Sequence, residues 1–467
     1  MVLNVLLAYQ TGQVAGNLHY KNPREDVAAV RDRRIQVVSE NQPLNRSYVA
    51  VNNLSLNGIN AHLLLNCEYR PKQIENYVSS IPHLVLASGR QESAVEFIFN
   101  YLKSRLINPE ELALLHHIHE KRINGHLSRG YTVLGTEDDK TVCLGEKVER
   151  FDGLKRPVWF VYSGLGSQWT GMGGQLMRIP RFAATIQRIH EVLEPRGVDI
   201  VDIITTTDKS AVRGIFNALL GITSIQIALT DVLADLGIVP DNIIGHSIGE
   251  LGCGYADGCL TLEEMILSAY YRGRVAEEIP VIKGAMCAVG LGYQKMRDMC
   301  PPGIYISCRN GPDSCTLSGP VEDIEKFSKK LEAEGIFVKT VASDDIAFHS
   351  PYIAAYNEIH KAYLREVITP RERSARWITS SVPAERAHEY TGRYSCAEYH
   401  NNNMMSAVLF EEALQHVPAN AILIEIAPHG LLQAILKRSV PSGCCNVPLT
   451  QRGHPDNVLF FLKAIGQ

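Results

Sequence analysis

The stretch Gly245-His246-Ser247-Ile248-Gly249 sets one serine between two glycines. The residues before it, 237–244 (GIVPDNII), predict a short buried strand, and those after it, 250–256 (ELGCGYA), can continue as a helix. A strand–serine–helix turn needs small residues two before and two after the serine, because its backbone is strained. It exposes the serine Oγ and points helix N-terminal amides at the place where an oxyanion would form. We therefore predict that Ser247 is a nucleophile; an ordinary glycine turn is the alternative.

A serine at its ordinary pKa is a weak nucleophile and needs a neighbouring base. The best candidate is His349 in the segment AFHS, residues 347–350. It ends an apolar, strand-like run, where a histidine can project into a cleft between two subdomains. A histidine at the end of a strand also serves structural roles, so this position alone leaves both interpretations open.

Two further elements accompany the serine. Arg272 follows two tyrosines on a helix predicted to start near Leu262. Most helical arginines are solvated, but a buried guanidinium needs a carboxylate partner, and a substrate carboxylate can bind it through two parallel hydrogen bonds. The glycine-rich loop 163–168 (SGLGSQ) follows a predicted strand, and a plain loop is the alternative there. The amides of Leu165 and Ile248 can together form an oxyanion hole.

Composition narrows the class of protein. The chain has 467 residues, enough for about three domains, and a formal net charge of −4, which gives no electrostatic case for nucleic-acid binding. Its eleven cysteines include no CxxC pair and indicate scattered reduced residues rather than disulfides or a metal site. The N-terminus lacks a basic region, and no apolar run approaches the roughly 18 residues of a membrane span. We expect a cytoplasmic protein with no membrane span and no metal.

The chain divides into three segments. Residues 1–70 end in two extended apolar runs joined by the turn signal Asn57-Gly58, and residues 71–153 mix helix-like and hairpin-like stretches. From residue 154 onward, strands alternate with helices, which is the pattern of an α/β domain. Within that domain, residues 283–346 predict short strands around two helices, as in a small inserted α+β subdomain.

The α/β segment contains seven long stretches that occur in the order found in one family. From about residue 154 to the C-terminus the chain resembles the malonyl/acetyl transacylase domain of the animal type I fatty acid synthase. The matching stretches are SGLGSQWTGMG (163–173), GHSIGELGCGYADGCL (245–260), AYYRG (269–273), RNGPDSCTLSGP (309–320), AFHS (347–350), RSARWITSSVP (373–383) and LIEIAPHGLLQAILKR (423–438).

The resemblance implies an α/β-hydrolase-like core with a ferredoxin-like subdomain at about 283–346. It makes Ser247 the nucleophile, His349 the base and Arg272 the anchor for a malonyl carboxylate. Malonyl or acetyl groups would pass from CoA, through the serine, to a phosphopantetheine thiol on acyl carrier protein. No tightly bound cofactor is implied, and the other fatty acid synthase domains become expected partners. The resemblance also implies that the amides of Leu165 and Ile248 form the oxyanion hole. Further residues implied to contact the acyl-CoA substrate are Phe348, Asp313, Phe337 and Arg438.

The N-terminal segments resemble what precedes this domain in the same family. NLHYKNPRED (17–26) and VNNLSLNGINAH (51–62) look like the end of a thiolase-type β-ketoacyl synthase, with His62 at its decarboxylating histidine. Ser55 and Asn57 stand where glycines are usual, and Leu54 replaces an aromatic residue. The condensing cysteine is absent, so condensation is not expected. Residues 71–153, with LVLASGR at 84–90, are similar to the α/β linker between synthase and transacylase. The chain thus resembles a fragment or truncated paralogue of the synthase.

Two other interpretations remain open. A serine hydrolase of the α/β type also uses the GxSxG turn and places an acid between the serine and the histidine in chain order. A non-catalytic scaffold is favoured by the synthase-like segment, because that segment departs from the family pattern at several positions. Arg272 separates the first alternative from an acyltransferase, because a hydrolase needs no cation at this place.

Overall fold

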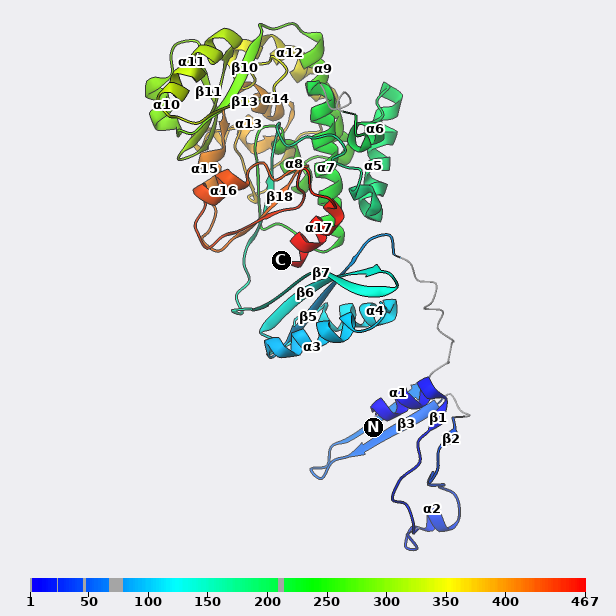
Figure 1. The fold of residues 1–467 in the computed structure, drawn as a ribbon. Helices are drawn as coiled ribbons and strands as arrows, with labels where there is room; N and C mark the ends of the chain where they lie inside the picture. The colour runs from blue at the N-terminus through cyan, green and yellow to red at the C-terminus, as the bar shows by residue number, and fades with distance from the viewer. Residues whose placement is uncertain (1, 23, 45–47, 67–78, 209–213) are drawn as a thin grey trace. The chain divides into compact units, whose positions relative to one another are not determined.

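The computed structural model describes residues 2–22, 24–44, 48–66, 79–208 and 214–467, which form two compact units, 1–78 and 79–467 (Figure 1). The predicted boundary between residues 70 and 71 lies outside the described residues. Each unit has its own secondary structure, and the second contains both the predicted linker and the predicted α/β domain.

The first unit is built around one antiparallel hairpin, formed by β3 (Tyr48–Leu54) and β4 (Asn60–Asn66). The predicted turn is present, and Gly58 takes a φ of +86°, a conformation that glycine tolerates. Tyr9 donates a hydrogen bond from its hydroxyl to the Leu65 carbonyl, 3.1 Å away. The remaining elements are short apart from α1: α1 (Val2–Thr11), β1 (Gln13–Val14), α2 (Ala28–Arg31) and β2 (Gln42–Pro43).

The linker forms a three-stranded antiparallel sheet, β5-β6-β7, with two helices; the sequence predicted helix-like and hairpin-like stretches here but not the third strand or the second helix. Its elements are β5 (His83–Gly89), α3 (Glu92–Lys103), α4 (Pro109–His119), β6 (Ser128–Glu137) and β7 (Lys140–Arg150). Phe99 of α3 is fully buried against one face of the sheet, near Gly130. The C-terminal helix α17 (Asn457–Gly466) packs on β6 from the other side, where a Cβ at Gly466 would lie 2.5 Å from the Tyr131 ring (Figure 1). The chain's last helix therefore ties the linker to the α/β domain.

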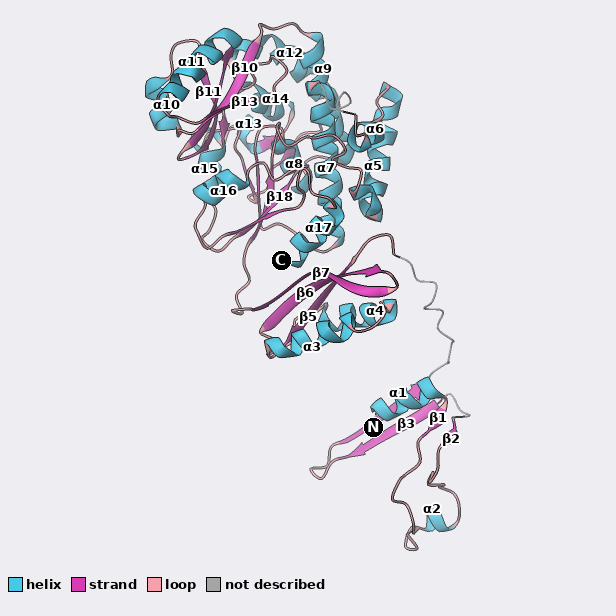
Figure 2. Cartoon of the chain, viewed as in Figure 1, coloured by secondary structure: helices cyan, strands magenta, loops and turns pink. Residues whose placement is uncertain are grey.

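The α/β domain contains a five-stranded, fully parallel sheet in the order β15-β9-β8-β18-β19. Figure 2 colours the strands of this domain, β18 among them, magenta and its helices cyan. The strands of the sheet are β8 (Val158–Tyr162), β9 (Asn242–Gly245), β15 (Trp377–Ile378), β18 (Ile422–Ile426) and β19 (Cys445–Pro448). Parallel strands buried on both faces are apolar throughout, and the sheet packs with α5 (Pro180–Leu193), α7 (Ile215–Asp235), α8 (Gly249–Ala256) and α9 (Leu262–Glu278) in the main core. Ligands of such sheets bind beyond the carboxyl ends of the strands, which is where the serine lies.

Helix α7 corrects the expectation that no apolar run approaches the roughly 18 residues of a membrane span. It has the length and composition of a membrane-crossing helix, and 89% of its most apolar window is buried inside the protein, as in the core helix of a folded domain. The helix also carries polar contacts of a core element: Thr230 bonds the Tyr162 hydroxyl at 2.8 Å, and Gln226 donates to the Ser163 carbonyl at 2.7 Å. Among the described helices it is the one that is long and apolar enough to cross a membrane, and it is the central helix of the core.

The inserted subdomain has the predicted ferredoxin-like topology. Its sheet runs β13-β10-β12-β11 with β–α–β–β–α–β connections, so the short strands and the two helices predicted for residues 283–346 are present. Strand β17 (Val408–Leu409), from outside the insert, adds to it in parallel beside β11. The elements are β10 (Gly284–Val289), α10 (Tyr293–Met299), β11 (Tyr305–Gly311), β12 (Ser314–Pro320), α11 (Val321–Ala333) and β13 (Val338–Val341).

The other elements of the domain are short connections and helices around these two sheets. They are η2 (Leu176–Arg178), η3 (Glu194–Arg196), α6 (Ile200–Thr205), η4 (Pro351–Tyr356), α12 (Asn357–Val367), β14 (Arg371–Glu372), η5 (Ala384–Arg386), α13 (Tyr390–Arg393), β16 (Tyr394–Ser395), α14 (Ala397–Met405), α15 (Phe410–Leu414) and α16 (Gln433–Ser439). Two of them, η4 and α14, come from the region that follows the insert and border the site together with β17.

Candidate active site

The serine turn has the geometry expected of a nucleophile elbow. Ser247 takes a φ of +55° between β9 and α8, a region that non-glycine residues enter rarely. A Cβ at Gly245 would lie 2.7 Å from the Glu250 nitrogen, and one at Gly249 would collide with the Tyr162 carbonyl oxygen. Both flanking glycines are therefore required by close approach of the backbone, as the motif predicts.

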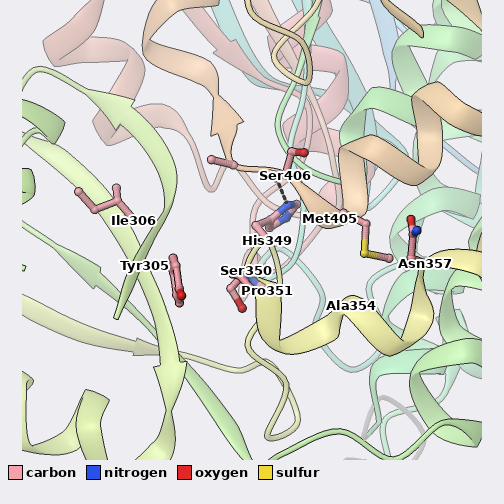
Figure 3. A pocket seen from close by; sticks show the side chains of 10 residues that line it. Tyr305, Ile306, His349, Ser350, Pro351, Ala354, Asn357, Met405 and Ser406 are labelled. Carbon is pink, nitrogen blue, oxygen red and sulfur yellow. Dashed lines mark hydrogen bonds between the residues drawn. The ribbon is translucent and has the colours of Figure 1, made fainter. Parts of the chain in front are cut away.

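The imidazole of His349 lies beside the serine. Its Nε2 is 2.8 Å from Ser247 Oγ. Its Nδ1 is 2.9 Å from the Ser406 carbonyl oxygen, a contact that Figure 3 marks with a dashed line. A carbonyl oxygen only accepts, so Nδ1 carries the proton and the bare Nε2 accepts the serine hydroxyl. His349 does not end a strand as expected: β13 ends at Val341, and His349 stands in the connection to η4 with a φ of +58°.

The electrostatic environment keeps this imidazole neutral. Burial, and after it the charge of Arg272, lower the pKa of His349 to about 3. The side chain is 5% exposed, and Ser247 is 7% exposed. A neutral imidazole with a free Nε2 is the form that takes a proton from a serine.

Arg272 is buried next to the pair and has no carboxylate partner. It is 4% exposed, its Nη1 donates to Asn403 Oδ1 at 2.8 Å, and its Nη2 lies 3.5 Å from Ser247 Oγ. Its Nε has no hydrogen-bond partner within the described chain, and no described Asp or Glu forms an ion pair with it. Burial lowers the pKa of Arg272 to about 9, so the group stays charged at neutral pH. An uncompensated buried cation is costly unless an anion joins it.

The loop predicted to complete an oxyanion hole packs on the elbow. A Cβ at Gly164 would lie 2.9 Å from the His246 carbonyl oxygen and 3.2 Å from the Ser247 Cβ, so only glycine allows this approach. The loop is fixed by its own side chains as well, since Gln168 accepts from the Gly166 amide at 2.7 Å. Leu165 follows Gly164, and Ile248 is the N-cap of α8, whose first amides have no acceptor within the helix.

A buried carboxylate that the sequence analysis did not single out holds the elbow. Glu250 is fully buried and accepts hydrogen bonds from Trp377 Nε1 at 2.9 Å, from the Ser380 amide at 2.7 Å and from the Tyr399 hydroxyl. Burial raises the pKa of Glu250. Its hydrogen-bond partners are far away in sequence, so no local sequence pattern predicts these contacts.

The inserted subdomain is attached to the elbow through the residue before the serine. His246 Nε2 lies 2.8 Å from Asn310 Oδ1 on β11, and Asn310 in turn donates to Thr316 Oγ1 at 3.1 Å. The rings of His246 and Phe410 meet edge to face. The orientation of the elbow is thus coupled to the small sheet.

A cavity of about 460 Å³ lies between the two subdomains on the Nδ1 side of the His349 imidazole (Figure 3). Its walls come from the start of β11, from η4 and from the segment after α14. They are Tyr305, Ile306, His349, Ser350, Pro351, Ala354, Asn357, Met405, Ser406 and Ala407.

The other predicted substrate contacts lie away from the serine. Asp313 and Arg438 are half exposed and pair with each other, at 2.9 Å between Oδ2 and Nε. Phe337 is exposed and lies beside Gly290, at the same end of the small sheet as the Asp313 turn. Phe348 is buried in the main core, and its carbonyl accepts from Ser318 at 2.8 Å. The roles of these four residues toward acyl-CoA stay predictions.

Two other features bear on the sequence predictions. His62 is exposed on β4 and contacts Asn52 across the hairpin. In the part of the chain that the structure describes, no group of three or more His, Cys, Asp or Glu side chains is placed to hold a metal ion.

Comparisons with known proteins place this site in a family. Residues 159–467 match the family described as Acyl transferase domain, and residues 23–133 match the Ketoacyl-synthetase C-terminal extension, which crosses the predicted boundary between the first two segments. A highly reducing polyketide synthase of Neurospora crassa is 28% identical over 94% of this chain, which spans 20% of that protein. A reducing polyketide synthase of Alternaria brassicicola is 34% identical over 60% of this chain, which spans 12% of it. The chain thus spans about a fifth or less of these relatives.

Solved structures that are similar to this chain are also acyltransferase domains. The acyltransferase domain of the polyketide synthase PpsC of Mycobacterium tuberculosis is 27% identical, with a TM-score of 0.58 over 64% of this chain and 92% of that one. The acyltransferase domain from module 8 of the salinomycin polyketide synthase, 19% identical, shares the fold with a TM-score of 0.67 over 83% and 95%. These relatives are polyketide synthases, so the expected likeness to the animal fatty acid synthase is confirmed for its acyltransferase character and not for that particular enzyme. The chain belongs to the acyl transferase domain family.

Proposed function

We propose that this chain transfers acyl groups from coenzyme A, through an ester on Ser247, to the phosphopantetheine thiol of an acyl carrier protein. One observation carries the proposal: a serine at 2.8 Å from a neutral buried imidazole, with an uncompensated guanidinium beside the same Oγ. The first pair supplies a nucleophile and a base, and the cation supplies a place for a carboxylated acyl group such as malonyl.

In the first half of the reaction, Ser247 Oγ attacks the thioester carbonyl carbon while His349 Nε2 takes the hydroxyl proton. The developing oxyanion is stabilised by the amides of Ile248 and Leu165. The carbon–sulfur bond then breaks, and the CoA sulfur leaves with the proton from Nε2. The products are the serine ester and free CoA.

In the second half, the carrier thiol attacks the ester carbonyl and gives its proton to His349 Nε2. The same two amides stabilise the second oxyanion, and the serine oxygen leaves with the proton from Nε2. Throughout both halves, the Ser406 carbonyl accepts from Nδ1–H, so it holds the ring orientation and stabilises the transient imidazolium.

The partner of His349 Nδ1 favours acyl transfer over the hydrolase alternative. A hydrolase of the α/β type uses a Ser–His–acid triad, whereas a backbone carbonyl occupies the position of the acid here. The arrangement is a dyad, and the buried cation beside it has no role in simple ester hydrolysis.

We propose that the acceptor and the setting are those of a multidomain synthase in the cytoplasm, with malonyl-CoA or acetyl-CoA as donor. The relatives named above are polyketide synthases, which favours a polyketide-type assembly. Fatty acid synthesis, suggested by the stretches 163–173 and 245–260, is the second candidate. Condensation is not proposed, because the condensing cysteine of that enzyme class is not found in the synthase-like segment.

Steady-state kinetics with malonyl-CoA and a purified phosphopantetheinylated carrier protein tests the proposal. Parallel lines in double-reciprocal plots and release of one CoA per acylated carrier are expected, because the ester intermediate separates the two half-reactions. Release of free malonate at the same rate with and without carrier would mean that the chain is a hydrolase. No CoA release at all would favour a non-catalytic scaffold.

A further inference from the structure

Asn403 is the residue that meets Arg272 inside the protein. It lies on α14, is 2% exposed, and accepts from Arg272 Nη1 at 2.8 Å. Because a guanidinium only donates hydrogen bonds, the side-chain oxygen of Asn403 faces Arg272 and its amide nitrogen faces away. That nitrogen donates to Ser381 Oγ at 2.8 Å, so the amide is held at both ends.

Three imidazoles of the described residues interact with the charge of this guanidinium, and all three are kept uncharged. The imidazoles of His349, His360 and His400 are buried, and burial together with the charge of Arg272 lowers the pKa of each to about 3. His360 donates from Nδ1 to Asn401 Oδ1 at 3.0 Å, and His400 lies 2.9 Å from Ser395 Oγ through Nε2. The cation is therefore surrounded by neutral dipoles and by no anion of the described chain.

A buried arginine is usually neutralised by a carboxylate, because desolvating a lone charge is expensive. Here the place of that carboxylate, on the helix facing Nη1, is taken by the neutral isostere of aspartate. The neutral acceptor orients the guanidinium and leaves its charge available to a ligand on the Ser247 side, where Nη2 lies 3.5 Å from Oγ.

We propose that Asn403 is a positioning residue that sets acyl selectivity: its amide fixes Arg272 without neutralising it, so the site prefers acyl groups that carry a carboxylate. The inference rests on the proposed transfer function and adds a second residue, remote from the reacting carbonyl, to the choice of substrate. The side chain of Asn403 does not touch the reacting atoms, because its hydrogen bonds are with Arg272 and Ser381. Only its backbone interacts with the His349 imidazole, and a side-chain substitution keeps that backbone group.

The charge at position 403 predicts how the variants rank in their preference for malonyl over acetyl, and a purely structural role of Asn403 predicts a different ranking. In Asn403→Asp a carboxylate of the same shape forms an ion pair with Arg272, and a substrate carboxylate then meets a neutral pair. In Asn403→Ala the guanidinium keeps its charge but loses its orientation. The ratio of malonyl to acetyl transfer should therefore fall in the order wild type, Asn403→Ala, Asn403→Asp. If Asn403 only supported the fold, Ala would be the worse variant, and both substrates would lose equally.

The matched control is Asn401→Asp, the same change on the same helix and at similar burial. Asn401 accepts from His360 Nδ1 and donates to Asn357 Oδ1, and it has no contact with Arg272. Any loss from placing a carboxylate in this buried region should act on both substrates by the same factor, so the ratio in Asn401→Asp should stay within about twofold of wild type.

The experiment measures single-turnover acylation of the full chain by malonyl-CoA and by acetyl-CoA, with thermal unfolding of each variant as a check on folding. We expect the malonyl/acetyl ratio of rate constants to fall at least tenfold in Asn403→Asp, with acetyl acylation retained. A ratio within twofold of wild type in folded Asn403→Asp, or in folded Asn403→Ala if the aspartate variant does not fold, would overturn the proposal. Wild type that no acyl-CoA acylates would instead contradict the proposed transfer function.

Discussion

Two regions of this chain carry family signatures around a histidine, and their surroundings differ. In the α/β domain, His349 is 5% exposed, and each ring nitrogen has a partner in a different segment. In the first unit, His62 is exposed on a two-stranded hairpin that also exposes Leu54 and Leu56. The comparison teaches that a histidine in a matching motif is suited to catalysis where the fold buries its imidazole and fixes the orientation of the ring.

The largest effect is expected at the buried histidine. His349→Ala removes the base, and general acid–base assistance contributes typically about 10²–10⁴-fold in rate. Acylation of Ser247 by acetyl-CoA, followed by rapid quenching and intact-mass measurement, should slow by that factor. A variant that keeps near-normal acylation at neutral pH would show that another group takes the serine proton.

Arg272→Ala should act on one substrate only. A charge-assisted hydrogen bond contributes roughly 1.5–3 kcal/mol, so malonyl transfer should fall about 10- to 150-fold while acetyl transfer survives. Arg272→Lys keeps the charge but loses the planar fork and should fall between wild type and Ala. The measurement is kcat/KM for both acyl-CoA donors. An equal drop for both would mean that Arg272 supports the fold and does not select the substrate.

The pH profile should be flat where an ordinary histidine would titrate. With its pKa lowered to about 3, His349 stays neutral from pH 8 down to pH 5.5. A solvated imidazole with a pKa of about 6.5 would be mostly protonated at pH 5.5 and would lose about tenfold in rate. Single-turnover acylation by acetyl-CoA should change less than twofold over this range. An acid limb centred near pH 6.5 would show that the imidazole is solvated in the free enzyme.

The smallest effect is expected at the exposed histidine. His62→Ala should leave acyl transfer unchanged and should alter the free energy of unfolding by no more than about 0.5 kcal/mol, as is usual for surface substitutions. Denaturant unfolding and the carrier-protein assay check both. A large loss in either would mean that the hairpin has a role that its exposure does not indicate.

The sequence predicted the site where function depends on local geometry. The elbow glycines, Ser247 and the small inserted subdomain follow from turn chemistry and periodicity. His349 and Arg272 were candidates from their sequence context, and the family resemblance gave them their roles. Asn403, Ser406 and Glu250 were missed, because each acts through a contact with a residue distant in sequence. A backbone carbonyl such as that of Ser406 has no residue signature at all.

The fold shows the same division. Helix α7 is as apolar as a membrane span, and only the surrounding core shows that its apolar surface is buried in protein. Strand β17 joins the small sheet from outside the insert, where two residues of pairing give no sequence pattern. The pairing of Asp313 with Arg438 likewise joins two segments far apart in the chain. Long-range contacts therefore account for most of what the sequence did not predict.

The central claim is that Ser247, paired with His349, carries the acyl group. Brief incubation of the full chain with malonyl-CoA, followed by intact-mass spectrometry and peptide mapping, tests it most directly. One malonyl adduct per chain is expected on the peptide that contains Ser247, and none in Ser247→Ala. An adduct that persists in Ser247→Ala, or that maps to another residue in wild type, would contradict the account.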